Sequence, residues 1–216
     1  MTLAVIDWSA VGWRAAVVVA GVAIWIWTQA LIGRRKDSGE ALGDRIHDWT
    51  ARWHAWFLAH PRATNRALIL SSLWIDVFGL FLIGAALFGP SFAPFLAILV
   101  VFGMRQICQG LCSLPPPQGM IWHDPGFPSL LVTYGVANDL FFSGHTALAV
   151  LGAIEASAVL PPWLAGIAVV IALGQMIFMI VLRAHYTLDV IAGLFAAFVG
   201  HSIAVRSAPW VDGLLK

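Results

Sequence analysis

The stretch WLAGIAVVIALGQMIFMIVL, residues 163–182, decides the fold class of this chain. None of its 20 residues is charged, and about 20 apolar residues in a helix cross the hydrocarbon core of a bilayer. Pro161 and Pro162 precede it and Arg183 follows it, which marks both of its ends. The stretch therefore predicts a transmembrane helix.

Five further apolar stretches lie on either side of it, bounded by charged residues, proline or glycine. Of the 216 residues, 60% are hydrophobic and 11% are charged, which is too apolar for a soluble globular protein. We therefore expect an all-α protein, a single transmembrane domain over residues 1–216 that forms a six-helix bundle in the cell membrane. The predicted spans are residues 11–32, 66–88, 92–112, 144–160, 163–182 and 186–205.

Two segments between these spans have a different character. Residues 44–60 mix charged side chains with tryptophans at roughly helical spacing, which predicts a helix lying in the membrane interface. Residues 113–142 include Pro115-Pro116-Pro117 and several glycines, so they cannot form a continuous spanning helix. We expect an active-site loop there, facing water or buried within the protein.

Charge and cysteine content exclude other classes of partner. The net charge is +1 and the arginines form no long basic block, so we expect no nucleic-acid partner. Cys108 and Cys112 are too few to build a metal site. We expect neither a metal ion nor another cofactor.

The first polar group that suggests chemistry stands at the start of the fourth predicted span, in the block that runs from Asp139 to Thr146. Ser143 is a natural N-cap, and Gly144 allows the backbone to approach a ligand closely. The free N–H groups of the following helix favour an anion. His145 is placed to donate a proton to a leaving oxygen during phosphoryl transfer. The alternative is an ordinary capped helix start with an interfacial histidine.

The second polar group lies at the start of the sixth predicted span and consists of Arg183, His185, Tyr186 and Asp189. His185 and Asp189 are four residues apart and share a helix face, so the carboxylate can orient one ring nitrogen and leave the other basic. This arrangement suits a nucleophilic histidine. Arg183 adds a charge for phosphate oxygens. The alternative is a structural His–Asp pair at a helix entrance.

Arg105 is the third polar group, within the third predicted span. An arginine there needs an anionic partner, either a carboxylate or the phosphate of a lipid. The alternative is that its side chain extends to the membrane surface.

These residues together resemble the sphingomyelin synthase family, within the type 2 phosphatidic acid phosphatase superfamily. The resemblance covers about residues 100–205, while the first two spans match only in layout. The matching blocks are Arg105 with Leu114-Pro115-x-Pro117, Asp139-x-x-x-Ser143-Gly144-His145-Thr146, and His185-Tyr186-Thr187-x-Asp189-Val190.

The resemblance implies a six-span fold and a two-step, metal-free mechanism. His185 would attack phosphorus to form a phosphohistidine, and Asp189 would orient it. His145 would protonate the departing alcohol oxygen, and a lipid alcohol or water would then accept the phosphoryl group. It also implies that Arg105, Arg183, Asp139, Ser143, Gly144 and Tyr186 contact the substrate.

Some positions depart from the patterns of these families. Asn138 stands where the synthases have glycine, and Leu194 and His201 replace expected aromatic residues, which puts the acceptor in doubt. The simpler phosphatases carry an arginine six residues before the nucleophilic histidine, where this chain has Met179. We therefore expect transfer or release of a phospholipid headgroup.

Two other hypotheses stay open: a lipid phosphate phosphatase that releases phosphate from a monoester, and a non-enzymatic transporter or lipid-binding protein.

With six spans, most positive charges outside the apolar stretches lie on the side of His145. The positive-inside rule therefore places the active site in the cytoplasm, although the resemblance implies the opposite side for most members.

Overall fold

The computed structural model describes residues 7–34, 40–134 and 140–215, and within these ranges it is all-α, with eight helices and no strand. The all-α prediction is confirmed. The helices are α1 (Trp8–Gly33), α2 (Arg45–Trp49), α3 (Ala51–Ala59), α4 (Pro61–Phe88), α5 (Ala93–Leu111), α6 (Gly144–Val159), α7 (Pro162–Val181) and α8 (Thr187–Leu214).

Five of the described helices are long and apolar enough to cross a membrane: α1, α4, α5, α7 and α8. The multi-pass prediction is thereby supported. The fourth predicted span forms α6, an apolar helix of only 16 residues, shorter than the roughly 20 that a crossing requires. The count of six spans is not confirmed, because α6 begins at Gly144, directly after Ser143, a polar cap buried inside the bundle with 0% exposure.

Two helices, α4 and α8, extend beyond the apolar spans predicted for them. Helix α4 begins at Pro61, five residues before the predicted start at position 66, because proline suits the first helical turn. Helix α8 continues past the apolar run to Leu214, through Pro209. Hydropathy locates the bilayer crossing, whereas capping and backbone hydrogen bonds locate the helix ends.

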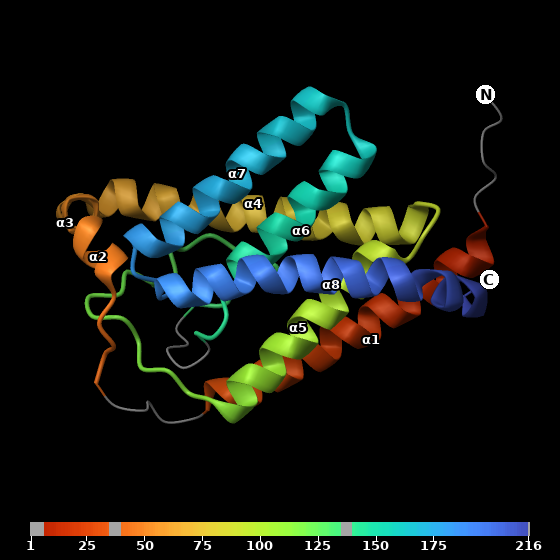
Figure 1. The fold of residues 1–216 in the computed structure, drawn as a ribbon, viewed down its shortest axis with the longest axis horizontal. Helices are drawn as coiled ribbons and strands as arrows, with labels where there is room; N and C mark the ends of the chain where they lie inside the picture. The colour runs from red at the N-terminus through yellow and green to blue at the C-terminus, as the bar shows by residue number, and fades with distance from the viewer. Residues whose placement is uncertain (1–6, 35–39, 135–139, 216) are drawn as a thin grey trace.

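Helix α6 lies at the centre of the bundle and packs against α4, α5, α7 and α8 (Figure 1). Nine of its residues are buried, and most are small. Between membrane helices such residues allow close packing, which supplies the van der Waals contact that stabilises association in lipid. The buried α6 residues are Thr146, Ala147, Leu148, Ala149, Val150, Leu151, Gly152, Ala153 and Ala156.

A partly buried ion pair ties α1 to the end of α8. Arg14 lies 3.5 Å from the carboxylate of Asp212 and donates to the Gly89 carbonyl oxygen at 2.9 Å. The same carboxylate accepts from the Phe92 N–H at 2.8 Å. These contacts lie at the end of the bundle opposite α2 and α3 (Figure 1).

The segment predicted as one interfacial helix forms two short helices, α2 and α3, which meet at Thr50. Trp49, Trp53 and Trp56 are exposed, whereas His47 and His54 are buried against the rest of the protein. Outward-facing tryptophans suit the headgroup layer of a membrane. The interfacial position itself stays a prediction.

The described parts of the predicted loop, residues 113–134 and 140–142, contain no helix or strand. Asp76 of α4 holds it: its carboxylate accepts from the N–H groups of Leu130 and Leu131, each at 3.0 Å, and from the Ser129 hydroxyl. These bonds satisfy backbone groups that a loop would otherwise leave unpaired. The loop is therefore fixed against the bundle, where its side chains contribute to the site.

Candidate functional site

A cavity of about 50 Å³ lies beneath the start of α6 and is named here the polar cavity. Four of the residues selected from the sequence line it, although they come from distant parts of the chain: Arg105, Gly144, His145 and His185. The other lining residues are Trp25, Ile75, Phe102, Trp122, Leu131, Thr133, Leu140, Leu148 and Ala184.

The start of α6 has the predicted cap. Ser143 precedes the helix in an extended conformation, and its hydroxyl oxygen accepts from the Thr146 N–H at 3.3 Å and from the Thr146 hydroxyl at 3.1 Å. A Cβ on Gly144 would come within 3.3 Å of Arg105 Nε. The absence of a side chain at Gly144 therefore lets the guanidinium lie against the first turn of α6.

The start of α6 lies close to α8 next to the site. The Ser143 N–H donates to the Asp189 carbonyl oxygen at 3.0 Å. A Cβ on Gly193 would lie 2.6 Å from the Ser143 carbonyl oxygen, so only glycine fits there. We missed Gly193 in the sequence, although Asp189, Gly193 and Ala197 follow a four-residue spacing that places small side chains on the helix face of the aspartate.

A turn after α7 brings His185 to the cavity. Arg183 has a φ of 55°, in the left-handed region, and the Ala184 N–H donates to the Met179 carbonyl oxygen at 3.0 Å. This backbone reversal is typical of a helix C-terminus. It turns the chain so that Ala184 and His185 line the polar cavity while α8 begins at Thr187.

Asp189 lies beside His185 but bonds elsewhere. His185 Nδ1 is 3.6 Å from Asp189 Oδ2, longer than a hydrogen bond. Oδ2 instead accepts from the Tyr186 N–H at 2.9 Å, as part of a capping box at the start of α8. Among the described residues, neither His185 Nδ1 nor Asp189 Oδ1 has a hydrogen-bond partner. The helix cap therefore competes with the histidine for the carboxylate, which the four-residue spacing did not reveal.

His145 contributes an unpaired nitrogen to the site. Its Nε2 is buried and finds no hydrogen-bond partner within the described parts of the chain. The ring packs edge-on against Trp122, with centroids 5.1 Å apart, and Trp122 is held by its N–H bond to the Thr133 carbonyl oxygen. A buried polar atom without a partner is costly, so this nitrogen is suited to a ligand oxygen.

Arg105 is buried, with 6% exposure, so its side chain does not extend to the surface as the alternative predicted. Its Nε donates to the Phe142 carbonyl oxygen at 2.8 Å, and Nη1 lies 3.4 Å from the amide oxygens of Gln29 and Gln109. These contacts hold the guanidinium at the cavity wall. The site thus receives a positive charge next to the capped end of α6.

Helix α2 supports the histidine loop, which the sequence did not predict. His47 Nε2 donates to the His185 carbonyl oxygen at 3.0 Å. Asp44 accepts from the Thr187 N–H at 2.6 Å and from its hydroxyl at 2.9 Å. Burial raises the pKa of Asp44, but the hydrogen bonds from Thr187 outweigh it and hold that pKa below its usual range. Asp44, which caps α2, was not identified from the sequence, because its contact with α8 joins residues far apart in the chain.

Arg183 does not line the polar cavity. Its Nη1 donates to the Gln118 carbonyl oxygen at 2.8 Å. His54 lies nearby, with Nδ1 2.9 Å from the Val181 carbonyl oxygen. Burial, with the positive charge of Arg183, lowers the pKa of His54. Substrate binding by Arg183 stays a prediction.

Tyr186 joins three segments through its side chain. Its hydroxyl donates to the Pro115 carbonyl oxygen and accepts from the Leu42 N–H, both at 3.0 Å, and its ring stacks on His47. A substrate contact by Tyr186 stays a prediction. Asp139, the remaining candidate, lies outside the described residues.

Comparison with known proteins assigns the chain to a family. The model of the AtPDCT1/2 family matches residues 44–206, which include α2 to α7, most of α8 and every residue of the polar cavity except Trp25. No curated protein and no solved structure matches the chain. The family is one of phosphatidylcholine:diacylglycerol cholinephosphotransferases, which supports an enzyme that acts on phospholipid phosphate esters.

This match corrects the resemblance drawn from the sequence, because neither the sphingomyelin synthase family nor the type 2 phosphatidic acid phosphatase superfamily matches. The two short blocks around His145 and His185 describe a capped helix start and a histidine one turn before an aspartate. Such blocks report the local geometry of a site, which different families can share. The chain belongs to the AtPDCT1/2 family.

Proposed function

We propose that this protein transfers phosphocholine from phosphatidylcholine to diacylglycerol through a phosphohistidine at His185. The observation that carries the proposal is the convergence of Arg105, the capped start of α6, His145 and His185 on one buried cavity. The family match supports the substrate class.

The polar cavity has the groups that a phosphodiester needs. The first N–H groups of α6 and the positive end of its dipole favour an anion, and Arg105 adds a full positive charge against the same turn. Charge that develops on phosphoryl oxygens during transfer is stabilised by such preorganised donors. Arg105 and the α6 turn therefore bind the phosphate and orient it for attack.

His185 performs the first half of the reaction. Its Nδ1 faces Asp189, which leaves Nε2 as the nitrogen for attack on phosphorus. A P–N bond forms while the P–O bond to diacylglycerol breaks, and the electron pair leaves on the glycerol oxygen. Protonated His145 gives that oxygen its proton. The products are diacylglycerol and phosphocholine-His185, and the charge of Asp189 stabilises the cationic ring.

The second half reverses these steps with a new diacylglycerol. Its hydroxyl gives its proton to His145 while its oxygen attacks phosphorus, and the P–N electron pair returns to His185. His145 thereby regains the proton that the next turnover requires. His185 is buried, with 7% exposure, and the Nε2 atom of His145 is also buried, which disfavours water as the acceptor.

Headgroup exchange between two lipids of different acyl composition tests the proposal. Purified protein receives dioleoyl phosphatidylcholine and dipalmitoyl glycerol, and mass spectrometry follows the appearance of dipalmitoyl phosphatidylcholine. His185→Ala should abolish transfer, and wild-type protein given choline-labelled donor should retain acid-labile label. Release of phosphate from phosphatidic acid without transfer would replace this proposal with a phosphatase, and lipid transport that survives His185→Ala would replace it with a transporter.

The arrangement in the membrane belongs to the same proposal. We infer that α6 completes a sixth crossing together with the buried residues that precede it, and that the tryptophans of α2 and α3 lie at headgroup level. Arg34, Arg45, Arg52, Arg62 and Arg66 then lie on the side of the site, which the positive-inside rule assigns to the cytoplasm. A reporter enzyme fused after the last residue that is active only in the cytoplasm would contradict this orientation.

A further inference from the structure

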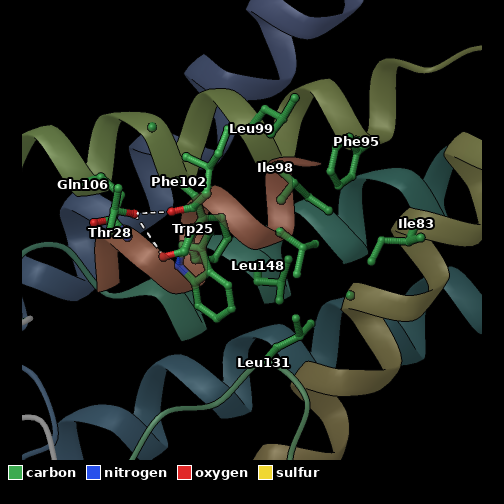
Figure 2. A pocket seen from close by; sticks show the side chains of 15 residues that line it. Trp25, Thr28, Ile83, Phe95, Ile98, Leu99, Phe102, Gln106, Leu131 and Leu148 are labelled. Carbon is green, nitrogen blue, oxygen red and sulfur yellow. Dashed lines mark hydrogen bonds between the residues drawn. The ribbon is translucent and has the colours of Figure 1, made fainter. Parts of the chain in front are cut away.

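A second cavity, of about 240 Å³, lies next to the polar cavity and is named here the apolar cavity. Helices α1, α4 and α5 form most of its wall, and Leu131 of the loop and Leu148 of α6 complete it (Figure 2). Its side chains are mainly aliphatic and aromatic, with Thr28 and Gln106 at one end. About 150 Å³ is enough for benzene in an apolar protein cavity. The apolar cavity is therefore large enough for a segment of an acyl chain.

The apolar cavity and the polar cavity share part of their walls. Trp25, Phe102, Leu131 and Leu148 line both of them. An apolar chain held in the larger cavity would therefore bring the group attached to it close to His145 and His185. This shared wall connects the apolar cavity with phosphate chemistry.

Residues at its rim lie on the outside of the bundle. Ile24 of α1 is 61% exposed, and Gly103 of α5 is also exposed. Both helices are long and apolar enough to cross a membrane, so this face of the protein meets lipid. A chain can enter the cavity sideways from the bilayer without its apolar part passing through water.

Two buried polar atoms in the cavity wall lack partners. The Trp25 Nε1–H donor and the Gln106 Oε1 acceptor have no hydrogen-bond partner within the described residues. Buried donors and acceptors are nearly always paired in native structures. One free donor and one free acceptor match the ester carbonyl and the hydroxyl of a neutral glycerolipid, and neither side chain carries a charge that would select an ionic group.

We propose that the apolar cavity holds an acyl chain of a diacylglycerol moiety, and that one such site serves both the donor phospholipid and the acceptor. The inference depends on the proposed headgroup transfer, in which the leaving group and the acceptor are the same chemical species. Because the intermediate on His185 retains only the headgroup, the first diacylglycerol leaves before the second binds. A single site then suffices, and donor and acceptor compete for it.

Substitution of Gly103 tests the site with little risk to folding. A Cβ on Gly103 meets no atom within 4 Å, and Gly110, about two helical turns further along α5, is equally open but lines neither cavity. Gly103→Leu and Gly103→Phe extend side chains at the rim of the cavity, and Gly110→Phe is the matched control. The measured quantity is the ratio of transfer rates for dioleoyl and dihexanoyl lipids, which a general loss of active protein does not alter.

We expect Gly103→Phe to lower the dioleoyl to dihexanoyl ratio by about tenfold, the order of discrimination that apolar pockets achieve. Gly103→Leu should have a smaller effect and Gly110→Phe none. Wild-type protein should also show competition between phosphatidylcholine and diacylglycerol at high concentration. An unchanged ratio in both Gly103 variants, or a ratio equally lowered by Gly110→Phe, would overturn the inference.

A binding measurement separates this inference from the proposed function. Phosphatidylcholine with a diazirine on its acyl chain is photolysed with the wild-type protein, and labelled residues are mapped by mass spectrometry. Label on Ile98, Leu99 or Phe102 that Gly103→Phe removes supports the acyl site even if no transfer is detected. Label confined to residues outside the cavity overturns the site even if headgroup transfer is established.

Discussion

Replacement of Gly193 by alanine should separate the two catalytic histidines. The added Cβ would lie 2.6 Å from the Ser143 carbonyl oxygen and 3.3 Å from Thr146 Cβ, whereas real Cβ atoms essentially never come within 3.0 Å of such atoms. The first contact is with backbone, so no side-chain rotation relieves it. The start of α6 must move away from α8 by at least about 0.4 Å, the difference between 3.0 and 2.6 Å.

The expected losses of stability and of transfer rate follow from that displacement. Overpacking of this kind costs about 1–3 kcal/mol of stability, and misplacement of reacting groups by about 1 Å lowers rates by up to about a hundredfold, or about 2.7 kcal/mol of activation free energy. We expect Gly193→Ala to reduce headgroup transfer by about 10- to 100-fold. Because His145 moves with α6 while His185 stays on the turn before α8, the loss should appear in kcat rather than in KM.

The assay compares transfer rate and thermal unfolding in detergent for wild type, Gly193→Ala and Gly213→Ala. Gly213 lies on the same helix, and a Cβ there meets no atom within 4 Å. Gly213→Ala should therefore keep wild-type activity. A Gly193→Ala protein with an unchanged melting temperature and a rate within about twofold of wild type would refute the close approach of α6 and α8.

Three further predictions follow from the support around His185. Asp189→Asn keeps an acceptor for the helix cap but removes the charge beside the His185 ring. Headgroup transfer should therefore fall by at least about a hundredfold, with a small change in melting temperature. Near-normal activity would contradict an orienting role for Asp189. Asp44→Ala removes two hydrogen bonds from Thr187 and should destabilise the protein by about 2 kcal/mol, measured as a lower melting temperature; an unchanged value would show that α2 does not hold α8. Because burial lowers the pKa of folded His54, the unfolded chain binds its proton more readily, and stability should decrease as pH falls below about 6.5. This decrease should be smaller in His54→Gln than in the control His60→Gln, and equal slopes would contradict it.

Much of the helical architecture could be predicted from the sequence. The stretch of residues 163–182 became α7 with a shift of one residue at each end, and residues 92–112 became α5, which is one residue shorter at each end. Uninterrupted apolar residues have few alternatives to a helix in lipid, since every backbone group must be paired within the segment. The cap at Ser143 was also predictable, because capping depends on neighbours in sequence.

Other features of the site could not be predicted in this way. The four-residue spacing of His185 and Asp189 indicated proximity, but the carboxylate bonds to the Tyr186 N–H, since a helix cap offered a shorter contact. His47 lies in the segment predicted to form an interfacial helix, yet it donates to the His185 carbonyl oxygen. Its role depends on how α2 folds back over the loop, for which residues 44–60 carry no local signal.

The sequence alone determined that this protein is an α-helical membrane protein and that Arg105, His145 and His185 stand at or near the ends of apolar stretches. Those properties are local, because hydropathy and capping depend on residues within a few turns of one another. Only the tertiary structure decided that the three residues meet at one cavity, that α6 lies at the centre of the bundle, and that an apolar cavity adjoins the site. These depend on which helix faces pack together, and that choice is made by small residues such as Gly193, whose significance appears only when the partner backbone is in place.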